Sequence, residues 1–128
     1  MISENEFFFD KTVLPQALEE NDPTLLLSFY QLFLDHTLPS WHKAELDARE
    51  HRWEDVRLVA HSLKSSSRGV GALQLGNQMA MIEKMIEGNL QTPEIIKEAT
   101  DIIARTTIEI SAHILALQAD AADSQSQS

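Results

Sequence analysis

The chain contains no cysteine among its 128 residues. This absence excludes disulfide bonds, thiolate metal ligands and cysteine nucleophiles. Basic residues are also scarce, because 10 lysines and arginines stand against 20 aspartates and glutamates, which gives a net charge of −10. Nucleic acids and anionic membranes attract proteins through basic surfaces, so we expect neither as a main partner.

Long apolar runs are absent as well. The longest runs, such as Phe7-Phe8-Phe9 and Leu25-Leu26-Leu27, are far too short to span a bilayer. The first residues, Met1-Ile2-Ser3-Glu4, show neither the basic region nor the long apolar region of a signal peptide. We therefore expect a soluble, cytoplasmic protein with no membrane contact.

Only four glycines and four prolines occur, and the apolar residues recur every three or four positions. This pattern favours helix nearly throughout, and no strand-like alternation or internal repeat is found. We expect a short helix over residues 10–19 and longer helices over residues 23–49, 52–69 and 73–87. A last helix is expected to begin at Thr92-Pro93 and to carry its apolar stripe as far as Leu117.

Local signals set several of these boundaries. Asp22 is a favourable N-cap and Pro23 suits a first helical position, while Gly88 suits a helix end. Pro39 lies inside the second helix, where it predicts a kink or a local break. Residues 118–128 are polar and low in complexity, which predicts a disordered tail.

Four amphipathic helices with short connections favour an all-α fold, an antiparallel four-helix bundle with a short additional N-terminal helix. At this length one domain is expected. Residues 1–9 are then an N-terminal segment, residues 10–117 the bundle domain and residues 118–128 the tail.

The helix over residues 52–69 places a histidine opposite its core face. On a helical wheel of about 100° per residue, His61 points away from the core, and Arg57, Lys64 and Arg68 lie within about 60° of it. Ser65 lies on the same side and adds little bulk. The opposite, core face carries Val56, Val59, Leu63, Ser67 and Val70. Neighbouring cations disfavour a protonated imidazole and attract an anion, for which a phosphoryl group is the obvious candidate.

Other interpretations of His61 and of the remaining histidines are also considered. His61 is also explained as an ordinary surface histidine among solvated cations. A metal site is disfavoured, because the five histidines are scattered without a His-Glu-x-x-His pair. A Ser-His hydrolase is disfavoured too, because His61 and Ser62 point about 100° apart on a helix. Glu83 is a candidate to pair with a cation near the site.

The sequence around His61 resembles a known signature. Ala60-His61-Ser62-Leu63-Lys64-Ser65-Ser66-Ser67, followed by Gly71-Ala72, is similar to the Ala-His-[Ser/Thr]-Leu-Lys-Gly-Ser-Ser and Gly-Ala pattern of the histidine-containing phosphotransfer (HPt) family. The resemblance covers residues 10–117. It includes Asp22-Pro23, Leu25-Leu26, Phe33-Leu34, Pro39, Trp53, Leu75, Met79, Ile82 and Glu83. The one clear departure is Ser65, where the family usually has glycine; we expect function to persist, with an altered partner set or transfer rate.

The resemblance implies a phosphorelay intermediate. His61 would accept a phosphoryl group from a receiver-domain aspartate and pass it to another, with Lys64 stabilising the phosphoryl charge. Arg57, Leu58, Ser65 and Arg68 would contact the phosphoryl group or the partner.

The implied partners are receiver domains of a hybrid sensor kinase and of a response regulator, and the carrier is expected to be a monomer. It needs no cofactor or metal, because Mg²⁺ would sit on the receiver. No ATP-binding loop is present, so the chain is not expected to be a kinase by itself. The alternative is a non-catalytic helical adaptor that binds a signalling partner without phosphotransfer.

Overall fold

The computed structural model describes residues 8–126, with side chains as far as residue 123. The described chain is all helical, as the sequence predicts, and contains no strand. The helices are α1 (Val13–Leu18), α2 (Pro23–Arg49), α3 (Trp53–Val70), α4 (Leu73–Glu87) and α5 (Pro93–Ser126). The predicted bounds of α2 and α4 are confirmed, and α3 begins and ends one residue later than expected. The helix expected over residues 10–19 is shorter at both ends.

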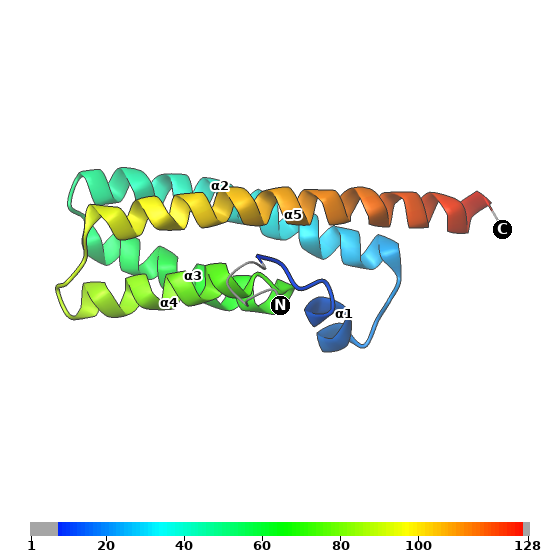
Figure 1. Cartoon of the computed structure of the whole chain (residues 1–128), viewed down its shortest axis with the longest axis horizontal. Coiled ribbons are helices and arrows are strands. Elements are labelled where there is room, and N and C mark those ends of the chain that lie inside the picture. Colours follow the sequence, from blue (N-terminus) through cyan, green and yellow to red (C-terminus); the bar gives the residue numbers. More distant parts are fainter. Residues whose placement is uncertain (1–7, 127–128) are drawn as a thin grey trace, which may run out of the picture.

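The helices pack into an elongated body (Figure 1). The two longest helices, α2 and α5, lie side by side and run in opposite directions. The pair α3 and α4 covers them over part of their length, with α3 against α2 and α4 against α5. The short helix α1 contacts α3. The centre of the core contains Tyr30, Val56, Leu63, Leu75, Met79, Ile82 and Ile110, all fully buried.

The start of α2 follows the sequence signal. The Asp22 side chain accepts a hydrogen bond of 3.1 Å from the backbone N–H of Thr24, and Pro23 occupies the first turn, where a missing donor does no harm. Pro39, in contrast, lies inside a helix that continues to Arg49. Of the kink or local break expected there, the break is wrong and the kink stays a prediction. Burial of Thr37 before it and Trp41 after it holds both parts of α2 against the core and offsets the lost hydrogen bond.

The last helix differs from the prediction. A disordered tail was expected from residue 118, but α5 continues through Ser126. Residues 118–122 read Gln-Ala-Asp-Ala-Ala, and alanine is the strongest helix former. Extending an existing helix is far easier than nucleating one, so a polar composition does not stop it. Residues 127–128 lie outside the described part of the chain, and the domain limits 10–117 stay a prediction.

Gly71 joins α3 to the N-terminal segment. It adopts a left-handed φ of 95° just after α3, and its carbonyl accepts a hydrogen bond of 2.8 Å from the Asp10 N–H. A Cβ on Gly71 would lie 2.1 Å from the Asp10 carbonyl oxygen. Both the backbone conformation and the close approach therefore require glycine.

Replacing Gly71 with alanine should lower the free energy of unfolding by about 2–4 kcal/mol, because the left-handed conformation is strained and the Asp10 segment must move. Gly69→Ala is the matched control, since nothing lies within 4 Å of a Cβ there. That variant should match the wild type or gain up to about 1 kcal/mol. Urea denaturation of both variants measures the difference, and equal stabilities would show that Gly71 has no special role.

Candidate functional site around His61

Glu83 of α4 lies at the centre of the site. Its Oε2 is 2.6 Å from Nδ1 of His61, and its Oε1 accepts a hydrogen bond of 2.8 Å from Nζ of Lys64. The Glu83 side chain is only 11% exposed, whereas the His61 side chain is 62% exposed. One carboxylate on α4 therefore contacts both His61 and Lys64 of α3.

The charge on Glu83 fixes which ring nitrogen carries the proton. The hydrogen bond from Lys64, followed by that from His61, holds the pKa of Glu83 below its usual value, against the opposing effect of burial. An ionised carboxylate only accepts hydrogen bonds, so Nδ1 of His61 must be the donor. In the neutral ring Nε2 then carries the lone pair on the exposed side of the imidazole.

The local sequence explains why these groups meet. Leu75, Met79 and Ile82 form the buried stripe of α4, and Glu83 follows directly at the edge of that stripe. On α3, Ala60 is fully buried just before His61, and its small side chain lets the two helices approach closely. The edge of the α3–α4 contact is therefore where His61 and Glu83 face each other.

Arg57 does not stand free beside the histidine. Its guanidinium donates hydrogen bonds of 2.6 and 2.9 Å to the Glu54 carboxylate. It also lies 3.8 Å from a Glu83 oxygen and 3.9 Å from a Glu87 oxygen. The three cations expected around His61 are therefore joined by carboxylates from α4, and the expected pairing of Glu83 with a nearby cation is confirmed at Lys64. The helical wheel considered α3 alone and left out the carboxylates that α4 brings to it.

The remaining predicted residues are exposed on the same helix. Leu58 is 52% exposed, and Ser65 is exposed one turn after His61. Arg68 is also exposed, and one guanidinium nitrogen lies 3.5 Å from the side-chain oxygen of Asn77. The structure thus brings Lys64 and Arg57 to the Glu83 carboxylate and leaves the other three facing outward.

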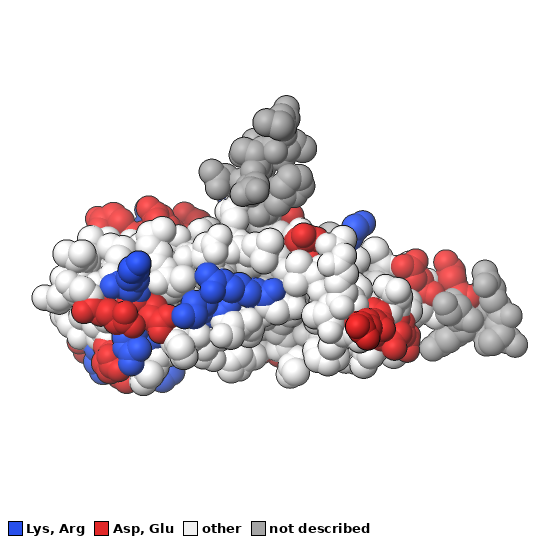
Figure 2. Space-filling model, turned by 90° about the horizontal axis from the view of Figure 1, so that it is seen from below, with Lys and Arg blue, Asp and Glu red and all other residues white. Residues whose placement is uncertain are grey.

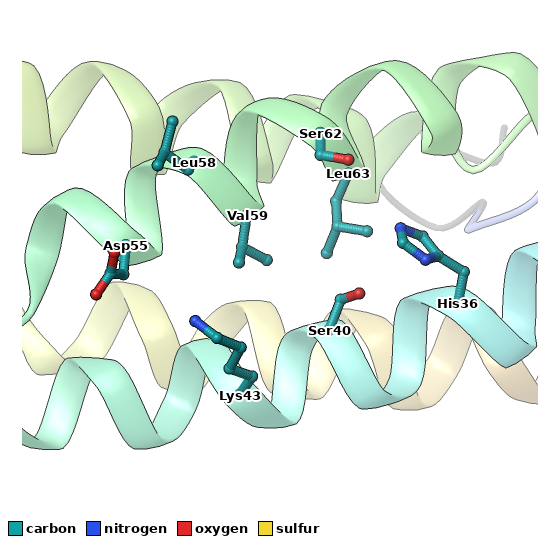
Figure 3. Close-up of a pocket in the computed structure, with 8 residues that line it drawn as sticks. All are labelled: His36, Ser40, Lys43, Asp55, Leu58, Val59, Ser62 and Leu63. Carbon is teal, nitrogen blue, oxygen red and sulfur yellow. The ribbon is translucent and has the colours of Figure 1, made fainter.

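A groove between α2 and α3 was not predicted. It encloses about 250 Å³, and His36, Ser40 and Lys43 of α2 face Val59, Ser62 and Leu63 of α3 across it (Figure 3). Asp55 and Leu58 complete its lining. Its position depends on how α2 packs against α3, which the periodicity of one helix does not reveal. The groove opens on the helix that carries His61, and Ser62 faces it rather than forming a pair with the histidine.

Among the described residues, no group of three histidine, aspartate or glutamate side chains is placed to hold a metal ion. Within the same residues, no helix combines the length and the apolar character that a membrane crossing requires. No family model, no curated protein and no solved structure matches the chain.

Proposed function

We propose that the chain is a histidine phosphotransfer carrier, which accepts a phosphoryl group on His61 from a receiver-domain aspartate and passes it to another. The observation that carries the proposal is the hydrogen bond between Nδ1 of His61 and Glu83, which leaves Nε2 exposed as a nucleophile. The His-Ser-Leu-Lys motif on α3 supports it. In this proposal α2 to α5 are the antiparallel four-helix bundle of the family and α1 is the additional helix.

The geometry suits the transfer step. The Nε2 lone pair attacks the phosphorus of the aspartyl phosphate and an N–P bond forms. The P–O bond to the aspartate breaks, and its electron pair leaves on that carboxylate. The ring is then positively charged and keeps its Nδ1 proton, which Glu83 stabilises through the 2.6 Å contact. In the onward step a second aspartate attacks the phosphorus, and the N–P electron pair returns to Nε2.

Lys64 is placed to stabilise the phosphoryl oxygens. It lies one turn after His61, and its ammonium already bonds to the carboxylate that holds the ring. A lysine side chain is long and flexible, so it can turn from Glu83 toward a phosphoryl group once that group is present. A helix that presents one nucleophile and one cation is sufficient here, because positioning and electrostatics dominate phosphoryl transfer. The receiver would supply its own acidic pocket and Mg²⁺.

The groove beside α3 supports a docking partner at this face. Leu58 and Val59 give it apolar lining three and two residues before His61. Lys43 lines it from α2 and is paired with Asp47 at 2.7 Å. A receiver domain seated over Leu58 and the groove would bring its aspartate toward the exposed ring. In the proposal this contact excludes water from the transfer step.

The direct experiment is phosphotransfer profiling. The purified chain is incubated with each receiver domain of its source organism, after that domain has been phosphorylated with labelled phosphate. We expect label to move to the chain from at least one receiver, and the bond to be labile in acid and stable in alkali, as a phosphohistidine is. Absence of transfer from every receiver would overturn the proposal and favour the adaptor.

A further inference from the structure

Arg68 differs from the other cations on the His61 face. Arg57 is bonded to Glu54 and Lys64 to Glu83, so the charge of each is already balanced within the chain. Arg68 makes no ion pair with any residue that the structure describes. It lies seven residues after His61, about 10 Å along the same face of α3. Figure 2 shows this side of the molecule, where basic and acidic side chains touch at one end and a basic stretch extends away from them.

The side chain of Arg68 packs against α4 at Gly76. A Cβ on this buried glycine would lie 2.7 Å from Cγ of Arg68 and 3.3 Å from its Nε. The aliphatic stem of Arg68 therefore lies across the α4 backbone where only glycine leaves room. Glycine inside a helix is less favourable than alanine, so helix formation does not explain its presence. Asn77, the next residue, contacts the guanidinium at the far end of the stem.

We infer that Gly76 and Asn77 hold Arg68 as a preformed contact for carboxylates on the acidic surface of the phosphotransfer partner. The inference rests on the proposed function and names the residue that recognises the partner. An acidic receiver face is repelled by a chain of net charge −10, so an unbalanced cation near His61 offsets that repulsion and orients the approach. An arginine that is already held in place loses less side-chain entropy on binding.

The contacts with Gly76 and Asn77 also keep Arg68 apart from the phosphoryl group. The stem is directed onto α4 at Gly76 and the guanidinium toward Asn77, whereas the groups that hold the ring are Glu83 and, through it, Lys64. Arg68 therefore acts on encounter with the partner and leaves the chemical step to the residues around Glu83.

The test compares Arg68→Ala, Gly76→Ala and the double variant with Lys97→Ala, an exposed lysine on α5 whose loss changes the net charge equally. We measure kcat and KM for transfer from a phosphorylated receiver over a range of salt concentrations. Arg68→Ala should lower kcat/KM about tenfold through KM, with kcat unchanged and a weaker dependence on salt. Gly76→Ala should lower kcat/KM through KM in the same way, because the added Cβ displaces Arg68. Its urea midpoint should stay equal to or above that of the wild type. The kcat/KM of the double variant should be no lower than that of Arg68→Ala.

Each other outcome overturns the inference. Transfer by Arg68→Ala that matches Lys97→Ala would show that the partner does not use this cation. Separate, additive losses in the double variant would show that Gly76 acts by another route. A loss confined to kcat would place Arg68 in the chemical step. Absence of transfer to the wild-type chain itself would overturn the proposed function, so the two failures are distinguishable.

Discussion

Replacing His61 with glutamine should abolish phosphoryl acceptance and leave the fold as stable as the wild type. The variant has no ring nitrogen with which to form the N–P bond. Its amide can still donate to Glu83, so the carboxylate keeps a partner. Because the His61 side chain is 62% exposed, we expect the free energy of unfolding to change by no more than about 0.5 kcal/mol. Labelled transfer from the cognate receiver and urea denaturation measure the two effects.

His42→Gln is the matched control for this variant. His42 is an exposed histidine on α2 whose side chain is 74% accessible. The His42→Gln variant should accept label at the wild-type rate, because His42 has no contact with the Glu83 cluster. Label that persists in His61→Gln would show that another side chain carries the phosphoryl group, which contradicts the assignment of His61.

The second large effect concerns Glu83. Replacing it with glutamine should slow phosphoryl transfer to His61 about 10- to 100-fold, the range found when a carboxylate that orients a metal-bound histidine is removed. The amide keeps the shape of the side chain but removes its charge. The positive charge that develops on the ring is then unsupported. The amide also offers one acceptor oxygen where the carboxylate offers two, so it cannot accept from both the ring and Lys64 through separate oxygens. The rate of a single turnover with phosphorylated receiver measures this effect.

Glu87→Gln provides the control on the same helix. It removes the same charge one turn later, from a carboxylate that is 56% exposed and lies 3.9 Å from Arg57. It should transfer at nearly the wild-type rate. A Glu83→Gln variant that reacts as fast as Glu87→Gln would show that the bond between Glu83 and the ring has no part in the reaction.

The sequence predicted the features that depend on a single helix. The cap at Asp22-Pro23 marked the start of α2 and Gly88 marked the end of α4, because such signals act within a few residues. The wheel placed Lys64 and Arg68 on the same side of α3 as His61 for the same reason. Composition was less reliable at the end of α5, where a polar stretch was interpreted as disorder although its alanines favour helix.

Features that depend on two helices were missed or only partly seen. Two contacts require the placement of α4 against α3. They are the hydrogen bond between Glu83 and the His61 ring and the packing of Arg68 on Gly76. A signal for the first was present, because Glu83 directly follows the buried residue Ile82 at the edge of the apolar stripe of α4. The unexpected glycine inside α4 was a signal for the second. Nothing in the pattern of apolar residues along the sequence indicated the groove between α2 and α3.

The most direct measurement is the position of the phosphoryl group on the modified chain. Phosphorus and nitrogen NMR of the protein, after transfer from a phosphorylated receiver, identify the side chain and the ring nitrogen that carry it. We predict one phosphohistidine, at His61, with phosphorus bonded to Nε2, because Nδ1 donates its proton to Glu83. Phosphorus bonded to Nδ1 of His61, or to any other side chain, would contradict the account.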